Sequence, residues 1–221
     1  MSDHSALLAL WNSRFALLNG LGETCLAACL SVGLGIAIGA LAAVTAVFGS
    51  QVLRTAISLY IYLLRGLPLL VIILFAYFGV GALWPALPAF ALTVAVMALF
   101  AGAQFAEIFR GAIQAIPHSQ FEAAKAIGLT FPARIVLIVL PLALRRAIPS
   151  ATNIAIEIIK STTLISVLGV SDLFLAGQQV AIRTLYIPET YLLLWLTYVV
   201  LCLVTAVLGS RLEQRFAHIS F

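Results

Sequence analysis

Long runs of uncharged, apolar residues recur along this chain, and the first of them covers Leu26 to Val47. A helix rises about 1.5 Å per residue, so about 20 such residues cross the ~30 Å hydrocarbon core of a bilayer. The composition agrees, because only 9% of the 221 residues are charged, whereas soluble domains average about 25%. The runs therefore predict an all-α integral membrane protein.

Five runs predict five transmembrane helices in a single domain, residues 1–221, with spans at roughly 24–49, 57–80, 89–110, 147–168 and 190–209. The second span contains Arg65 and Pro68. Proline removes a helix hydrogen bond and a buried arginine has to face protein or water, so we expect this helix to be kinked and to face the interior. The fourth span contains Glu157 and Lys160, which share one helix face.

The basic residues of the links divide unequally between the two sides of the predicted bundle. One side has Arg54, Arg110, Lys125, Arg134, Arg145, Arg146, Arg211 and Arg215, and the other has Arg14 and Arg183. Cytoplasmic loops carry the excess of Lys and Arg, so we expect residues 107–146 and the C-terminus in the cytoplasm and the N-terminus outside. The basic residues form no run, which speaks against a nucleic-acid partner.

The link 112–141 contains polar, helix-forming sequence. Ser119 and Glu122 have the spacing of a capping box, which predicts a helix that begins at Ser119. Gly128 is suited to the left-handed conformation that ends many helices, and Thr130 is suited to cap a second one. The link therefore predicts a small helix-turn-helix that projects into the cytoplasm.

Small residues in the first span predict close helix packing. Gly33, Gly35 and Gly39 superficially resemble a phosphate-binding loop, but they lie within an uncharged span with no lysine nearby. Gly35 and Gly39 are four residues apart, so they are expected to form a stripe that lets another helix approach closely, in this chain or in a partner subunit.

The sequence Glu122-Ala123-Ala124, followed by Gly128 and Leu140-Pro141, resembles the EAA coupling loop of ATP-binding-cassette (ABC) importer permeases. Arg65 to Leu70, Ala106 to Gly111 and Lys160 to Val167 resemble further segments of the same family, in its order and spacing. The resemblance covers most of residues 22–215. The chain is most similar to permeases of the polar amino acid uptake family, of the histidine, glutamine or arginine type.

This resemblance implies a fold, a location and partners. The fold is that of a type I ABC importer permease, with five transmembrane helices and a cytoplasmic coupling helix-turn-helix, in the bacterial cytoplasmic (inner) membrane. The implied partners are an ABC ATPase dimer, a second permease copy or a homologous permease, an extracytoplasmic solute-binding protein, an amino acid substrate and membrane lipid. The chain itself binds no cofactor in this scheme, because it has no Walker motif and the ATPase would hold ATP and Mg²⁺.

The resemblance also suggests site residues. Those expected to couple to the ATPase are Ser119, Glu122, Ala123, Ala124, Lys125, Gly128 and Leu129, and those expected along the substrate path are Arg65, Gln104, Glu157, Lys160, Ser161 and Thr162. Neither catalytic residues nor metal ligands are expected, since histidines and carboxylates do not recur at metal-ligand spacing.

Several alternatives stay open at this point. The family often has an aspartate where Ser161 stands, and Glu157, four residues earlier on the same face, is a hypothetical replacement for its charge. Glu157 and Lys160 either bind substrate or only neutralise each other. A methionine-type ABC permease and a secondary amino-acid transporter are the alternative functions. The sequence does not identify the amino acid substrate, and it does not distinguish a homodimer from a heterodimer.

Overall fold

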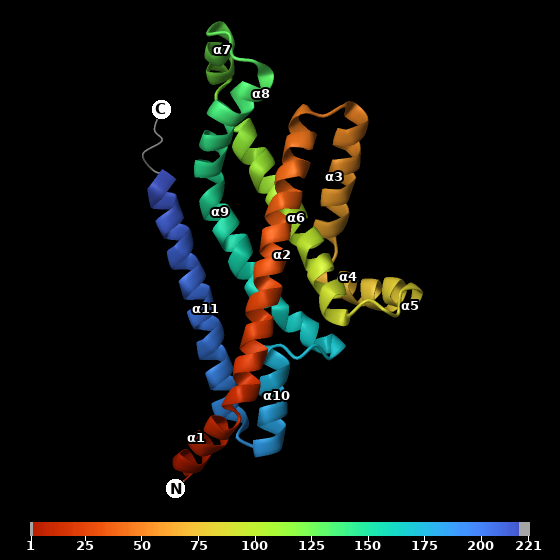
Figure 1. Cartoon of the computed structure of the whole chain (residues 1–221), viewed down its shortest axis with the longest axis vertical. Coiled ribbons are helices and arrows are strands. Elements are labelled where there is room, and N and C mark those ends of the chain that lie inside the picture. The colour runs from red at the N-terminus through yellow and green to blue at the C-terminus, as the bar shows by residue number, and fades with distance from the viewer. Residues whose placement is uncertain (1, 217–221) are drawn as a thin grey trace.

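The computed structural model describes residues 2–216, and nearly all of them are helical (Figure 1). The elements are α1 (Ser2–Asn12), α2 (Arg14–Phe48), α3 (Gln51–Gly66), α4 (Leu69–Phe75), a π-helical turn (Ala76–Val80), α5 (Gly81–Leu83), α6 (Ala89–Gln114), α7 (His118–Ala126), α8 (Phe131–Arg134), a second π-helical turn (Ile135–Val139), α9 (Leu140–Ser161), a 3₁₀ segment (Thr162–Leu168), α10 (Leu173–Thr184) and α11 (Ile187–Phe216). No β-strand occurs within residues 2–216.

Four helical stretches are long and apolar enough to cross a membrane, namely Arg14–Phe48, Ala89–Gln114, Phe131–Leu168 and Ile187–Phe216. Each is longer than the apolar run that predicted it. The reason is that backbone hydrogen bonding continues a helix through polar residues beyond the hydrocarbon. α2, for example, has 35 residues, although its apolar core is shorter.

The second predicted span departs from the expectation of one kinked helix. α3 and the stretch from Leu69 to Leu83 meet at 104°, and they form a fifth span only if the bent pair is counted as one. Pro68 has no N–H and disfavours helical backbone at Leu67, which is extended with φ −108° and ψ 144°. The expected inward orientation is also wrong for α3 within this chain, because Ile61 is its only buried residue.

The centre of the bundle is the crossing of α2 and α6 (Figure 1). A β-carbon at Gly35 would lie 2.7 Å from the Ala101 β-carbon, and one at Gly39 would lie 2.5 Å from the Phe105 β-carbon. Only glycine permits this approach. The predicted small-residue stripe therefore packs against a helix of the same chain.

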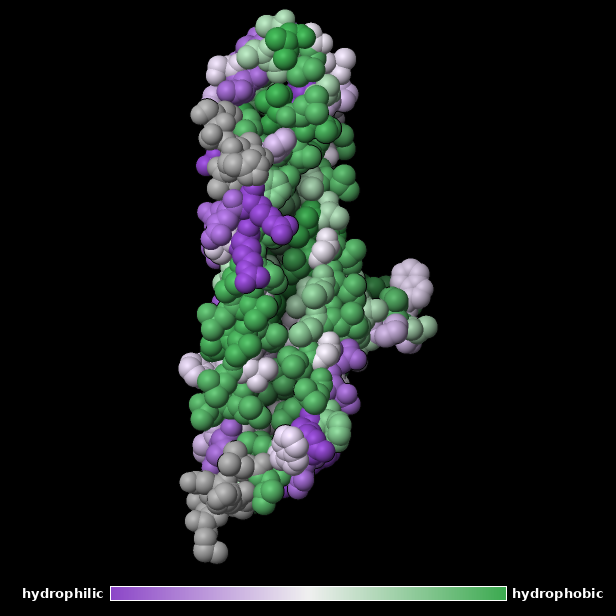
Figure 2. Space-filling model, turned by 60° about the vertical axis from the view of Figure 1, so that its left-hand side comes forward, coloured by the Kyte–Doolittle hydropathy of each residue, from purple (hydrophilic) through white to green (hydrophobic). Residues whose placement is uncertain are grey.

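α1 and α10 were not predicted from the sequence. α1 precedes α2, and α10 packs between α2 and α11 at the same end of the molecule (Figure 1). Asp172 begins α10 by accepting a hydrogen bond from the Leu175 N–H at 2.9 Å. Figure 2 shows apolar surface over much of one face, with hydrophilic residues gathered toward the upper part and near the lower end.

Candidate functional site

α7 and α8 project from one end of the molecule, beyond the ends of α2 and α3 (Figure 1). The connection from α6 to α7 is fixed by Ile116, which is buried in a cluster with Ile113, Val139 and Leu142. Phe121 of α7 packs against the same cluster. The projecting pair is therefore seated on the bundle by apolar contacts.

The predicted capping box is not formed. α7 begins at His118, one residue earlier than expected, because the extended Pro117 (φ −58°, ψ 136°) occupies the N-cap position. Ser119 is thus already inside the helix, and no side chain caps the first turn. Glu122 instead lies 3.8 Å from the His118 imidazole, a pair that is exposed to solvent.

The end of α7 agrees with the prediction. Gly128 adopts the left-handed conformation, with φ +81°. Its N–H donates to the Lys125 carbonyl at 3.0 Å, and the Leu129 N–H donates to the Ala124 carbonyl at 3.1 Å. These two bonds form a Schellman motif. The turn therefore has a defined geometry, which directs the chain into α8.

The projecting pair presents a mixed surface to solvent. Ala124 is buried at 4% exposure, whereas Glu122, Ala123 and Lys125 are exposed. Beside the turn, Ile127 is 76% exposed. A large apolar side chain at the tip of a projection typically marks a protein interface when it is part of a larger patch. Ile127 was not among the predicted site residues, although an apolar residue directly before a helix-ending glycine was a visible signal.

α8 contacts α2, and Phe121 of α7 packs against a cluster that includes residues of α6 and α9. The rings of Phe131 and Phe48 meet edge to face, with centroids 5.3 Å apart, which joins α8 to the end of α2. Arg146 of α9 donates to the Ala115 carbonyl at the end of α6. A displacement of α7 and α8 is therefore expected to move α2, α6 and α9.

The structure does not gather the six predicted path residues at one place. Arg65 is exposed near the end of α3, and Gln104 is half-buried on α6. Glu157 and Lys160 are both exposed on α9, and no ion pair joins them within residues 2–216. Ser161 is half-buried, and Thr162 is fully buried on another side of the helix. Their assignment to a path stays a prediction.

Arg65 instead belongs to a polar cavity of about 280 Å³ between α3 and α6. Glu107 accepts two hydrogen bonds from the Arg110 guanidinium, with an Nε–Oε2 distance of 3.1 Å, and Arg110 also donates to Gln114 at 3.0 Å. Arg65 is close enough to Glu107 to interact with its charge. The i, i+3, i+7 spacing on α6 was the sequence signal for this cluster, but Glu107, Arg110 and Gln114 were not predicted to form a site together.

Thr162 lies in a buried polar cluster at the opposite end of the bundle. Thr24 accepts a hydrogen bond from the Leu173 N–H at 3.0 Å, and the Tyr198 hydroxyl lies near Thr24, Thr162 and Asp172. Asp172 is fully buried, and its Oδ2 has no hydrogen-bond partner within the described chain. Burial raises the pKa of Asp172 to about 6.

Comparison with known proteins gives consistent matches over nearly the whole chain. The family described as binding-protein-dependent transport system inner membrane component matches residues 35–218. The glutamine transport system permease protein GlnP of Escherichia coli K12 is 32% identical over 209 residues, 94% of this chain and 95% of that protein. The probable amino-acid ABC transporter permease protein YckA of Bacillus subtilis is 30% identical over 91% of this chain and 89% of that protein.

Solved structures share the fold. A crystal structure of an amino acid ABC transporter with histidines has a TM-score of 0.85 and 29% identity, over 94% of this chain and 97% of that chain. The MetNI methionine ABC transporter in an inward-facing conformation has a TM-score of 0.76 at 19% identity, over 91% of this chain and 96% of that chain, which is a likeness of fold alone.

Proposed function

Because the chain belongs to the family of binding-protein-dependent transport system inner membrane components, we propose that it is the permease subunit of an ATP-driven importer for polar amino acids or related amino compounds. It forms the translocation path together with a second permease, either another copy or a homologous chain. ATP and Mg²⁺ bind to a partner ATPase dimer, and an extracytoplasmic solute-binding protein delivers the substrate.

The projecting pair α7 and α8 carries this proposal. A helix that ends in a Schellman turn and presents the exposed Ile127 offers a compact surface for a soluble partner. Its contacts with α2, α6 and α9 provide a route by which closure of the ATPase dimer moves the spanning helices. Ser119, Glu122, Ala123, Lys125 and the Gly128-Leu129 turn complete the docking surface in this proposal.

The distribution of charge supports a cytoplasmic location for this end. α7, α8 and the turn between α2 and α3 lie at one end of the molecule, and α1 and α10 lie at the other (Figure 1). The eight basic link residues belong to the first end, and Arg14 and Arg183 to the second. We place the N-terminal end outside and the α7 end in the cytoplasm. The C-terminus itself falls in residues 217–221, outside the described residues, and α11 ends at the proposed cytoplasmic side.

The substrate proposal rests on the named relatives and on the charges of this chain. The relatives are named for glutamine and for amino acids. Glu157 and Lys160, which are exposed on α9 and form no ion pair within residues 2–216, supply one charge of each sign for the ammonium and carboxylate of an amino acid. We assign them, together with Gln104 and Ser161, to the path between two permeases, whereas Thr162 is buried near Tyr198 and donates to the Ile159 carbonyl.

A capture experiment tests the ATPase assignment. The full chain in nanodiscs is offered the ATPase subunit of its own transport system, and bound ATPase and ATP hydrolysis are measured. Ile127→Glu is expected to lower capture by roughly tenfold or more, because it places a charge in an apolar contact. Ile182→Glu is the matched control, since Ile182 is 73% exposed on α10 at the opposite end.

The capture result and a separate uptake measurement distinguish the alternatives. Equal capture of the ATPase by both variants would mean that α7 does not form part of the ATPase interface. Amino acid uptake driven by an ion gradient in vesicles that hold no ATPase would establish a secondary transporter instead. A secondary transporter would have no need for a projecting helix pair of this kind.

A further inference from the structure

An apolar groove follows the seam where α2, α9 and α11 meet. It has a volume of about 270 Å³ and is lined on α11 by Thr205, Leu208, Gly209 and Leu212. The only hydroxyls in its wall are those of Thr152 and Thr205, which donate to the Ile148 and Leu201 carbonyls of their own helices. The groove therefore presents no unsatisfied polar group to an occupant.

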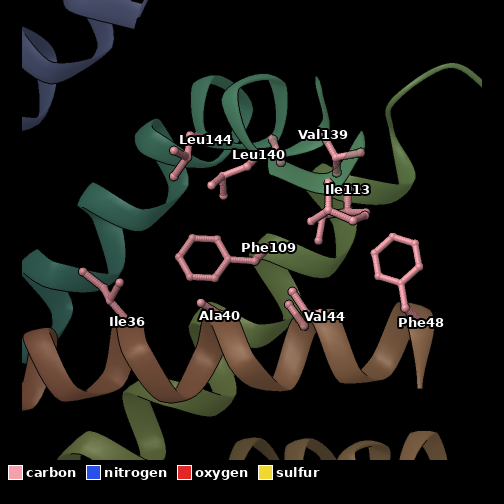
Figure 3. A pocket seen from close by; sticks show the side chains of 12 residues that line it. Ile36, Ala40, Val44, Phe48, Phe109, Ile113, Val139, Leu140 and Leu144 are labelled. Carbon is pink, nitrogen blue, oxygen red and sulfur yellow. The ribbon is translucent and has the colours of Figure 1, made fainter. Parts of the chain in front are cut away.

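A second apolar cavity continues the groove. The two share Ile36, Phe109 and Leu144 in their walls. Figure 3 shows side chains from α2, α6 and α9 converging on this cavity, with Phe48 at its far end and Phe109 at its centre. All of its lining residues are apolar. The extended groove is thus suited to hydrocarbon and not to a peptide or a hydrated ligand.

The groove ends at two arginines. Leu208 and Leu212 also line a third cavity, whose other wall residues are Arg211, Gln214 and Arg215. Arg215 follows Leu208 by two helical turns and therefore lies on the same face of α11. Neither arginine forms an ion pair within residues 2–216, and Glu213, two residues from each, points to another side of the helix.

The length of the groove matches one leaflet of a bilayer. Ten residues separate Thr205 from Arg215, which is about 15 Å along α11. Half of the hydrocarbon core is also about 15 Å deep. Basic residues at the membrane surface attract anionic lipid headgroups, and basic pockets between transmembrane helices bind them.

From this combination we propose that the α2–α9–α11 groove binds one anionic glycerophospholipid from the leaflet at the basic end of the molecule. The acyl chain lies along Leu212, Leu208 and Thr205, and the phosphate lies between Arg211 and Arg215. Since the second cavity reaches Phe48, which contacts Phe131 of α8, the bound lipid lies next to the helices that support the projecting pair.

Tryptophan quenching by brominated lipids tests the site. Leu208→Trp is made in the full chain after Trp11, Trp84 and Trp195 have been replaced by phenylalanine. The protein is reconstituted in phosphatidylcholine vesicles with a small fraction of brominated phosphatidylglycerol or brominated phosphatidylcholine. We expect selective quenching by phosphatidylglycerol, and we expect the ratio of the two binding constants to fall roughly fivefold for each of Arg211→Gln and Arg215→Gln. Arg183→Gln, at the opposite end, should leave the ratio unchanged.

Two outcomes of the quenching experiment would overturn the proposal. Equal quenching by both lipids would mean ordinary contact with the bilayer, and absence of quenching by either would mean that protein, such as a second copy of the chain, covers the groove. Native mass spectrometry of the chain with its natural tryptophans is an independent measurement, in which the Arg211→Gln/Arg215→Gln variant should retain less phosphatidylglycerol. Equal retention by both proteins would also contradict the site.

Discussion

At the scale of single residues, Asp172 combines two roles that conflict. Its Oδ1 caps α10 through the Leu175 N–H, while its Oδ2 is buried without a partner near the Tyr198 hydroxyl of α11. The cap needs only an acceptor, which a neutral side chain also supplies. The negative charge is therefore a cost to folding, and this cost explains why the pKa of Asp172 is raised from 3.8 to about 6.

The raised pKa predicts how stability depends on pH. Between about pH 4 and pH 6 the folded state binds more protons at Asp172 than the unfolded state does, so this residue lowers stability as the pH rises through that window. Asp172→Asn keeps the cap and removes the charge. We expect it to raise the melting temperature at pH 7.5 by roughly 2–4 °C or more, and by less at pH 5.

Thermal unfolding of the purified chain in detergent at the two pH values measures this difference. Asp172→Ala, which loses the cap, should be less stable than Asp172→Asn at both pH values. Glu189→Gln is the control for removal of an exposed carboxylate. A larger gain for Asp172→Asn at pH 5 than at pH 7.5 would show that the buried carboxyl is not the cause.

At the scale of elements, the apolar runs predicted the spanning helices and the membrane fold, and the helices and structural relatives confirm this fold class. α10 was missed because its 12 residues are too short to span, although Asp172 in front of it was a visible capping signal. The sharp turn at Pro68 could not be predicted from the sequence either. A proline predicts a lost hydrogen bond, but a bend of 104° depends on what α4 and α6 pack against.

A glycine-to-alanine substitution is expected to have opposite effects on stability at two positions of α2. Alanine favours a helix over glycine by about 1 kcal/mol, so Gly33→Ala should be stabilising, since a β-carbon there meets no atom within 4 Å. At Gly39 the new β-carbon would lie 2.5 Å from the Phe105 β-carbon and 2.9 Å from the Ala106 nitrogen. Gly39→Ala should therefore separate α2 from α6 and cost about 1–3 kcal/mol.

Melting temperatures of the two variants in the same detergent test this contrast. Both changes add one methyl group to the same helix, so effects on helix propensity cancel in the comparison. A Gly39→Ala protein as stable as Gly33→Ala would mean that the α2–α6 crossing is looser than described.

At the scale of the whole molecule, the coupling helix and the path residues differ in how accurately the sequence predicts them. The projecting helix ends at Gly128, and the signal for this end is local, because a left-handed residue at a helix terminus favours glycine. The start of the helix was misplaced by one residue because Pro117 competes with Ser119 for the N-cap. One subunit does not bring the path residues together, which is expected if, as we propose, the path lies between two permeases.

The two ends of the molecule make a final prediction about topology. Ile127, at the tip of the projection, and Leu185, in the turn between α10 and α11, are 76% and 77% exposed at opposite ends. In a background where Cys25, Cys29 and Cys202 are replaced by alanine, Leu185→Cys should react with a membrane-impermeant maleimide in spheroplasts. Ile127→Cys should react only after lysis, because we place the basic end in the cytoplasm. Added ATPase should then slow the reaction of Ile127→Cys alone. Labelling of Ile127→Cys from outside would reverse the orientation and place the docking surface where no ATPase could reach it.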